Sequence, residues 1–332
     1  MSTKPTVSEL ETAARRLLPL WGLHEARLEF LSQSENTVFK AVASTGECFV
    51  LRVHRPGYHT LPELESEHLW TRALNEAGIS APRPRKTLDG CGYAEMTLAC
   101  GGHKFTVGLS EWVEGETLRA LAGDDDSTQS HCDNMRAVGK LLGRLHNQVE
   151  GWQAPVEFTR HALDADGLMG ERPFWGPFWA ASELGNARRA TLRRLRRQMH
   201  AALSTLDRGP DVFGLIHADL HPGNVLDNGR ELHIIDFDDA GFGWHAYDLA
   251  IPLLPYDHRN DFARISDALV AGYRTQRRLG KSVLERLPMF RCIRRLAQIG
   301  WDADRPELDK PERIPRLADE AIGLARTLTL TD

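Results

Sequence analysis

The chain has 332 residues and a net charge of −5, from 41 lysines and arginines against 46 aspartates and glutamates. Hydrophobic residues make up 42% and charged residues 26%, which predicts a folded globular protein, and the acidic balance argues against a general nucleic-acid binder. The length exceeds that of one ordinary core and suits two lobes.

The lack of targeting signals and the spacing of the cysteines limit the compartments in which the protein is expected. The sequence has no apolar run long enough to span a membrane and no signal-peptide pattern near Met1. Its five cysteines form no CxxC pair and leave one over, which is typical of reduced thiols. These features predict a cytoplasmic protein with no membrane partner.

The N-terminal part changes from a helical to a strand-like period. A helix is expected at 7–20, followed by strands at 28–30, 38–43 and 48–53. The turn at 32–36 is small and polar, so its backbone N–H groups could hold a phosphate around Ser34. An ordinary hairpin loop is the open alternative, because the turn lacks the glycines of a strong phosphate-binding loop.

The third strand and the helix after it carry an opposed charge pair. Arg52 lies inside the apolar run of that strand. In the helix, Thr60 and Glu63 form a capping box, so Glu63 already has a local role. Glu67 follows one turn later on the same face as Trp70, and a carboxylate on an apolar face needs a cation, for which Arg52 is the nearest candidate. The alternative places Glu67 in water at the edge of that face.

The rest of the chain passes from strands to helices. Strands are expected at 85–88, 93–98 and 104–107, a crossover between lobes at 109–115, and a mobile polar segment at 123–127. Helices are expected at 135–149, 192–206, 262–273, 283–298 and 314–328. The aromatic cluster at 174–179 is typical of a packed plug, and the arginine-rich stretch at 188–197 is typical of a solvated helix face.

The segment 215–250 holds the densest group of ionisable residues on an apolar frame. Within it, Asn228-Gly229 between two strand-like runs predicts a hairpin with a type I′ turn. That hairpin would carry Asn224 and Asp236 to its open end, beside Asp219. Oxygen-bearing side chains gathered so closely need a cation or a proton.

Three chemistries compete for this segment. Metal-dependent hydrolysis would use His217, Asp219 and His221 as ligands, but the alternation breaks at Pro222 and no further histidine cluster completes a transition-metal set. Dinucleotide binding would use the loose GxGxxA at 241–246, but no βαβ unit surrounds it. Phosphoryl transfer from ATP needs a carboxylate at the acceptor, an Asn and an Asp for Mg²⁺, and a cation for the nucleotide phosphates.

Asp219, Asn224 and Asp236 supply the acceptor and Mg²⁺ groups that phosphoryl transfer needs, and Arg52, paired with Glu67, supplies the cation. Two loops of the segment 215–250 also resemble loops of a known family. Residues 216–224 and 235–238 resemble the catalytic and metal loops of the aminoglycoside phosphotransferase/choline kinase-like superfamily. The resemblance covers nearly the whole chain. Residues 51–58 and 174–179 look most like the group of the bacterial stress-response Ser/Thr kinase and the type II homoserine kinases.

The resemblance implies a fold class and two domains. The fold would be α+β, a two-lobed protein-kinase-like fold with a β-rich N-lobe and a mainly helical C-lobe. The N-lobe, at 1–112, would be a nucleotide-binding antiparallel sheet with one pairing helix. The C-lobe, at 113–332, would carry the catalytic and metal loops and the acceptor site.

Carried over residue by residue, the resemblance assigns roles in the C-lobe. Asp219 would be the catalytic base. Asn224 and Asp236 would ligate Mg²⁺, with Asp238 as an assisting group. Asp248 would brace the catalytic loop.

In the N-lobe the resemblance implies an ATP site. Arg52 stands at the nucleotide-binding strand position where the family usually has a lysine, and Glu67 is its helix partner. Ser110 and Trp112 lie in the segment that resembles the adenine-binding hinge, and Ser34 lies in the first polar turn. A guanidinium donates through a planar fork of N–H groups, whereas a lysine ammonium acts as a point charge. The phosphate contact at Arg52 therefore differs from that of a lysine.

The predicted function is an ATP- and Mg²⁺-dependent kinase that phosphorylates a hydroxyl group of a small molecule. A protein Ser/Thr acceptor is the close alternative, and a non-catalytic nucleotide-binding module and a metal-dependent hydrolase are more remote ones. His217 is expected to be structural, and His221 either structural or near the acceptor. The sequence leaves the acceptor and the oligomeric state open.

Overall fold

The chain folds into two compact units in a computed structural model that describes residues 5–34, 36–98, 102–123, 125–306 and 312–329. The first, named the sheet unit, comprises Met1–Gly115, Ala154–Thr159 and Asn228–Ile235. The second, named the helical unit, comprises Glu116–Gln153, Arg160–Asp227 and Asp236–Asp332. The lobe limits 1–112 and 113–332 remain predictions of the sequence.

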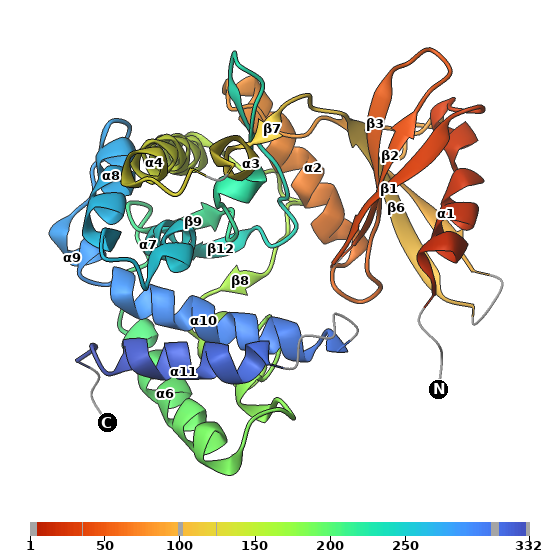
Figure 1. Ribbon diagram of the computed structural model, residues 1–332. Helices are drawn as coiled ribbons and strands as arrows, with labels where there is room; N and C mark the ends of the chain where they lie inside the picture. Colours follow the sequence, from red (N-terminus) through yellow and green to blue (C-terminus); the bar gives the residue numbers. More distant parts are fainter. Residues whose placement is uncertain (1–4, 35, 99–101, 124, 307–311, 330–332) are drawn as a thin grey trace. The chain divides into compact units, whose positions relative to one another are not determined.

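Antiparallel strands form the body of the sheet unit (Figure 1). Strands join in the order β1-β2-β3-β6-β4, and β5 also pairs with β6. The elements are α1 (Val7–Arg15), the 3-10 turn η1 (Leu18–Trp21), β1 (Arg27–Gln33), β2 (Thr37–Val42), β3 (Cys48–Val53), α2 (Leu61–Glu76), β4 (Pro84–Arg85), β5 (Tyr93–Thr97), β6 (Lys104–Glu111) and β11 (Leu232–Ile234). The single helix expected at 7–20 is therefore interrupted, because Pro19 cannot donate a helical hydrogen bond and the chain continues as η1.

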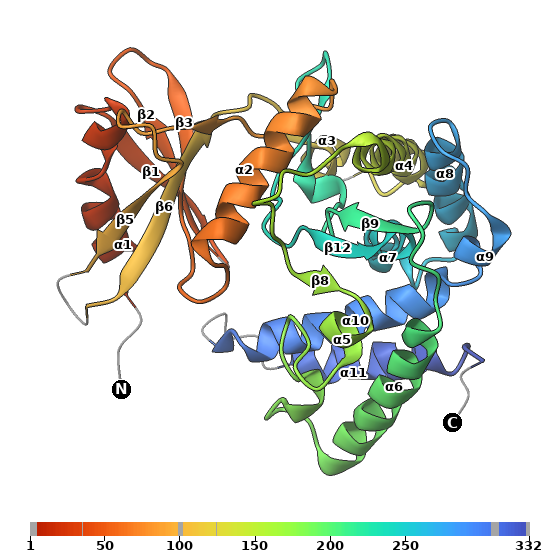
Figure 2. The ribbon, with the colours of Figure 1, turned by 180° about the vertical axis from the view of Figure 1, so that it is seen from behind.

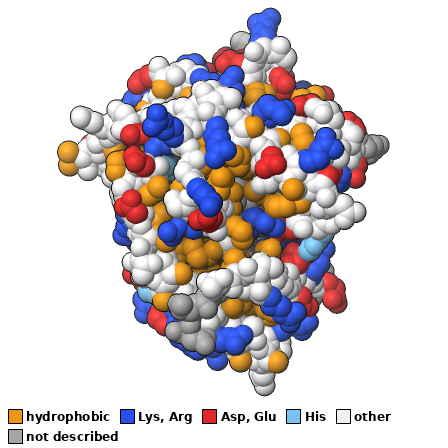
Figure 3. All heavy atoms as spheres, turned by 90° about the vertical axis from the view of Figure 1, so that its left-hand side faces the viewer, with side chains coloured by type: hydrophobic (Ala, Val, Ile, Leu, Met, Phe, Trp, Pro, Cys, Tyr) orange, Lys and Arg blue, Asp and Glu red, His pale blue; other side chains and the backbone are white. Residues whose placement is uncertain are grey.

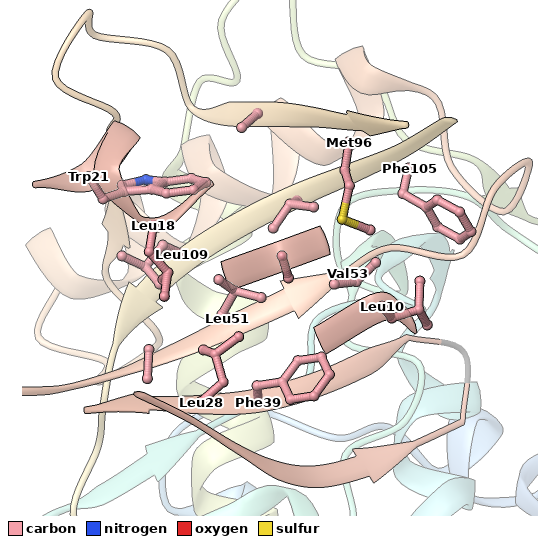
Figure 4. Packing of buried hydrophobic residues seen from close by; sticks show 14 of the residues in the cluster. Leu10, Leu18, Trp21, Leu28, Phe39, Leu51, Val53, Met96, Phe105 and Leu109 are labelled. Atoms are coloured by element: carbon pink, nitrogen blue, oxygen red, sulfur yellow. The ribbon is translucent and has the colours of Figure 1, made fainter. Parts of the chain in front are cut away.

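The two faces of β3 have different partners, because side chains alternate along a strand. Phe49, Leu51 and Val53 are buried on one face and belong to the core beneath α1 and η1. Figure 4 shows Leu51 and Val53 among Leu10, Leu18, Trp21 and other side chains of this core. Arg52 consequently lies on the opposite face of the strand.

Helix α2 lies on the other side of the sheet from α1, as Figures 1 and 2 both show. The predicted capping box is present: the Thr60 backbone N–H donates to Glu63 Oε2 at 2.8 Å. The Tyr93 hydroxyl donates to the Leu64 carbonyl at 2.9 Å and fixes the first turns of α2 to strand β5. The helix thereby presents Glu67 to the face of β3 that carries Arg52.

Strand β6 extends further than the sequence suggests. The chain was expected to leave the sheet from Leu109, but β6 continues to Glu111. Val50 pairs with Ser110 and Phe49 with Glu111 across the β3–β6 ladder, so Ser110 lies within the sheet.

Helices dominate the helical unit. Its elements are β7 (Glu116–Thr117), α3 (Leu118–Ala122), α4 (Thr128–Gly151), β8 (Ala162–Leu163), α5 (Ala165–Met169), η2 (Phe178–Ala180), α6 (Asn186–Ser204), β9 (Phe213–Ile216), η3 (Pro222–Asn224), β10 (Val225–Asp227), β12 (Gly241–Trp244), α7 (His245–Ala250), η4 (Ile251–Tyr256), α8 (Phe262–Arg274), α9 (Lys281–Leu284), α10 (Leu287–Ala303) and α11 (Arg313–Ala325). Helix α4 packs against α8, and α10 against α11. Trp175, Phe178 and Trp179 are buried, so the aromatic cluster is a packed plug as predicted.

The predicted type I′ turn at Asn228-Gly229 is wrong. Gly229 has φ +79°, but Asn228 is not in the left-handed region. Instead, the Asn228 side-chain oxygen accepts hydrogen bonds from the backbone N–H groups of Arg230 (2.9 Å) and Glu231 (3.0 Å). The asparagine therefore caps a four-residue loop between β10 and β11 instead of forming a tight turn.

The surface of the protein and the length of its helices bear on possible membrane and nucleic-acid contacts. None of the helices within the described residues is long and apolar enough to cross a membrane. On the face shown in Figure 3, Lys and Arg side chains are scattered among acidic and hydrophobic ones. That face therefore carries no field of a single sign.

Replacing Leu51, which is fully buried in the core beneath α1, by alanine should lower the free energy of unfolding of the sheet unit by about 3 kcal/mol, because a cavity remains after the side chain is lost. Leu31→Ala is the matched control, since Leu31 is 45% exposed on the edge strand β1. Urea unfolding of both variants measures the two changes. An equal loss of unfolding free energy in both would contradict the prediction that the core around Leu51 stabilises the sheet unit.

Candidate active site

The catalytic loop, residues 216–224, follows β9 and contains a strained backbone. Ala218 has φ +65°, a left-handed conformation that is unfavourable for a residue with a Cβ. Asp248 on α7 holds it there: its carboxylate accepts from the backbone N–H groups of His217 at 3.0 Å and Ala218 at 2.8 Å. The predicted bracing contact of Asp248 is thus present in the structure.

A buried histidine on α4 completes this brace. His146 Nε2 lies 3.1 Å from Asp248 Oδ2, and its Nδ1 lies 2.9 Å from the Tyr273 hydroxyl. Burial lowers the pKa of His146 to about 3 and raises the pKa of Asp248. The imidazole is therefore neutral, donating from Nε2 to the carboxylate and accepting the tyrosine proton at Nδ1.

Two predicted site residues meet within the catalytic loop. The Asn224 side-chain N–H donates to the Asp219 carbonyl at 3.0 Å and lies 3.4 Å from Asp219 Oδ2. Among the described residues, none donates to the amide oxygen of Asn224. That oxygen suits a hard cation such as Mg²⁺, which takes carboxylate and amide oxygens.

The two loop histidines serve the backbone. His217 Nδ1 accepts from the Asp219 N–H at 3.2 Å, and His221 Nδ1 accepts from the Gly223 N–H at 3.0 Å. Burial, followed by the neighbouring Arg119, lowers the pKa of His221 to about 3. The His221 ring is therefore neutral. In both residues the engaged Nδ1 fixes the loop backbone, which is the structural role expected for His217.

The predicted metal loop, residues 235–238, together with the adjacent Asp239 is named the metal loop in the structure. It contains the second strained residue. Asp236 has φ +66°; it and Ala218 are the non-glycine residues of the described chain with positive φ. The Phe237 ring packs 4.8 Å from that of His217 and joins the two loops. Strain at two adjoining acidic loops is typical of a functional site.

Arg160, which the sequence analysis did not identify, holds the main chain of the metal loop. Arg160 is buried and donates from Nε to the Ala240 carbonyl at 2.6 Å. Its Nη2 donates to the carbonyls of Phe237 at 3.1 Å and Asp238 at 2.5 Å. The loop is thus fixed through its main chain, and its acidic side chains are not needed for that contact.

A second arginine absent from the sequence predictions lies against Asp219. Arg294 on α10 is buried, and its Nη2 lies 2.5 Å from Asp219 Oδ1. The signal was available, since Arg294 falls inside the apolar face of a predicted helix, as Glu67 does. Its partner lies 75 residues away along the chain, and the sequence alone could not identify it.

In the sheet unit, Arg52 and Glu67 form the predicted ion pair, with Arg52 Nη1 3.0 Å from Glu67 Oε1. Glu67 is buried, so the alternative that places it in water is wrong. Ser110 joins the pair in lining one small pocket. Three of the expected nucleotide-site residues therefore lie together.

The other two expected nucleotide-site residues lie elsewhere in the sheet unit. Trp112 stacks under the Lys40 ammonium, whose Nζ is 4.3 Å from the ring centroid. Ser34 is exposed, and its N–H donates to the Asn36 carbonyl at 3.0 Å. Glu35 of the same turn lies outside the described residues.

The dinucleotide-binding alternative fails on the packing of its glycines. A Cβ at Gly241 would meet the His161 carbonyl at 2.7 Å, and one at Gly243 would meet the Ile216 side chain at 2.6 Å. Both glycines lie in β12, between β8 and β9. They allow close strand packing and do not open a phosphate-binding turn.

Comparison with known proteins identifies the family of the chain. Residues 27–287 match the model of the phosphotransferase enzyme family. The chain belongs to this phosphotransferase family. Membership confirms the family, the α+β class and the enzyme type predicted from the two loops.

Relatives of the phosphotransferase include kinases of several small molecules. The solved structure of a microcompartment-associated aminopropanol kinase is 30% identical, with a TM-score of 0.80 over 94% of each chain. An amicoumacin kinase of Bacillus subtilis is 24% identical over 87% of this chain and 82% of its own. A homoserine kinase of Chelativorans sp. is 33% identical over 65% of this chain and 61% of its own.

The buried histidines predict a pH dependence of stability. Burial lowers the pKa of His245, which stacks on His146, to about 2. Between that value and about 6.5, the unfolded chain binds a proton that the folded chain does not, so the free energy of unfolding falls as pH decreases through this window, by up to about 1.4 kcal/mol per pH unit for each such histidine. Urea titrations of the wild type and His245→Gln should show a shallower slope for the variant.

The matched control is His258→Gln, because the His258 side chain is 76% exposed. Its slope should equal that of the wild type. Parallel curves for the wild type and His245→Gln would contradict the assignment of His245 as a buried neutral group.

Proposed function

We propose that this phosphotransferase moves the γ-phosphoryl group of ATP to a hydroxyl group of a small molecule. The observation that carries the proposal is the braced catalytic loop, which presents the Asp219 carboxylate beside the Asn224 amide. Phosphoryl transfer is catalysed mainly by positioning and charge neutralisation, and a rigid loop with fixed oxygen atoms supplies both.

In the proposed reaction Asp219 orients the acceptor. Its side chain is 25% exposed, Oδ1 lies 2.5 Å from Arg294 Nη2 and Oδ2 lies 3.4 Å from Asn224 Nδ2. In this scheme Oδ2 is the oxygen that contacts the acceptor hydroxyl. The acceptor oxygen forms a bond to the γ-phosphorus as the bond from that phosphorus to the β,γ-bridging oxygen breaks and ADP departs. The hydroxyl proton passes to Asp219 and then to solvent.

The proposed metal ligands are Asn224 and Asp236, with Asp238 assisting. The donor set fits Mg²⁺, since it consists of carboxylate oxygens and the amide oxygen of Asn224. A bound Mg²⁺ would neutralise charge on the nucleotide phosphates. The left-handed backbone at Asp236 would set the direction of this carboxylate.

The proposed nucleotide contacts lie in the sheet unit. Glu67 holds Arg52 with its guanidinium largely buried, so the cation is ordered before ATP binds. Arg52 would contact the phosphates, Ser110 and Trp112 the adenine, and Ser34 the phosphate end of the first turn. Because arginine donates through a planar fork, Arg52 can contact two phosphate oxygens at once.

A small-molecule acceptor is favoured over a protein by the relatives named above, which are kinases of aminopropanol, amicoumacin and homoserine. Hydrolysis by a transition metal is disfavoured, because Nδ1 of His217 and of His221 accepts a backbone N–H. The proton of the neutral ring is then on Nε2, which offers no lone pair to a metal. A purely nucleotide-binding role is disfavoured by the strain maintained in both acidic loops.

Asp219→Asn should lower kcat about 10²–10⁴-fold with ATP affinity unchanged, since the loss of a base affects the transition state. The assay follows labelled phosphate from Mg·ATP onto homoserine, 1-amino-2-propanol, an aminoglycoside and a Ser/Thr peptide. Asp207→Asn, on the exposed loop after α6, should retain full activity. Unchanged turnover of the Asp219 variant would exclude it as the base, and transfer to the peptide alone would overturn the small-molecule acceptor.

Asp236→Asn should weaken binding of the Mg²⁺ complex of a non-hydrolysable ATP analogue by about tenfold or more, because asparagine tolerates the left-handed backbone but lacks the charge. Calorimetric titration measures this. Asp211→Asn, at an exposed position before β9, is the control and should bind as the wild type does. Equal affinities for all three proteins would refute the metal role of Asp236.

A further inference from the structure

Arg294 is a charged side chain in an apolar setting. It lies on α10 between Ile293 and Arg295, and it is 8% exposed. Transfer of a guanidinium from water to such a place is costly unless carboxylates accept its protons. Its position therefore depends on the partners that it meets there.

Those partners come from both acidic loops. Arg294 Nη2 lies 2.5 Å from Asp219 Oδ1 in the catalytic loop, and Nη1 lies 3.9 Å from Asp239 Oδ2 at the end of the metal loop. The guanidinium also lies over the Trp175 ring, with Cζ 5.1 Å from the centroid. The Trp175 indole N–H in turn donates to Asp239 Oδ1 at 3.3 Å.

This arrangement removes the rotational freedom of the base. With Oδ1 held by a buried guanidinium, Asp219 keeps Oδ2 near the Asn224 side-chain nitrogen (3.4 Å) and His221 Nε2 (3.8 Å). A guanidinium is planar and remains charged, so the contact is directional at every pH of interest. Asp239 and Trp175 fix the guanidinium itself from two other sides.

We propose that Arg294 is a positioning residue for phosphoryl transfer, which holds Asp219 so that a single oxygen faces the acceptor hydroxyl. The inference rests on the proposed function. Arg294 touches neither nucleotide nor acceptor in this scheme and acts through Asp219. It also links the two loops, so that the base and the metal-binding segment keep a constant separation.

The same helix supplies a matched control. Arg291 is also buried on α10, three residues earlier, and pairs with Asp257, with Nε 2.8 Å from Oδ1. Its guanidinium lies 4.2 Å from the Phe262 ring. Arg291 thus has the same residue type, helix, burial and kind of partners, but neither of these partners belongs to the catalytic or metal loop.

The test compares Arg294→Ala, Arg294→Lys and Arg291→Ala in the full chain. The readout is ADP release from Mg·ATP, with water and with each of homoserine and 1-amino-2-propanol as acceptor. Arg294→Ala should lose about 10²-fold in kcat with KM for ATP within about twofold, because misplacement of the base affects the reaction and not nucleotide binding. Arg294→Lys should fall between it and the wild type, and Arg291→Ala should lose thermal stability but keep kcat within about threefold.

Chemical rescue separates positioning from folding. Guanidinium ion at millimolar concentration should raise kcat of Arg294→Ala, since it can fill the space left beside Asp219, and should leave Arg291→Ala unchanged. Full kcat in a folded Arg294→Ala protein, or equal kcat losses in the two alanine variants without rescue, would overturn the proposal. An inactive wild type would instead refute the proposed function, so the two failures are distinguishable.

Discussion

The structure depends on one buried carboxylate. Asp248 accepts two backbone N–H groups and thereby keeps Ala218 in a conformation that an alanine would otherwise leave. The backbone conformation at Ala218 sets the path of the chain after it in the catalytic loop, and with it the positions of the Asp219 and Asn224 side chains. The neutral His146 behind the carboxylate makes the brace independent of pH over the physiological range.

Charge balance explains how the helical unit tolerates its acidic loops. Asp219 and Asp239 have Arg294 between them, and the metal loop is tied down through carbonyl groups by Arg160. Asp236, in the metal loop, is the carboxylate that we propose for the cation. The proposed function thus assigns different acidic residues to internal charge pairing and to metal binding.

Features with a local cause could be predicted from the sequence, and features with a distant partner could not. The Arg52–Glu67 pair followed from a carboxylate on an apolar helix face, and the family followed from two short loops. The tight turn at Asn228 was wrong, because its side chain caps a wider loop. Arg160 and Arg294 were missed, since their partners lie about 75–80 residues away and nothing in a single sequence pairs them.

Main-chain bracing has a consequence for how this site can change. Asp248 contacts the catalytic loop through backbone N–H groups, and Arg160 contacts the metal loop through C=O groups. Every residue has the C=O, and every residue except proline has the N–H. Neighbouring side chains can therefore be exchanged with little effect on loop geometry. Libraries of variants selected for new acceptors should therefore tolerate substitutions beside the loops, but not at Asp248 or Arg160. In this way related enzymes can differ in their acceptors while they catalyse the same reaction.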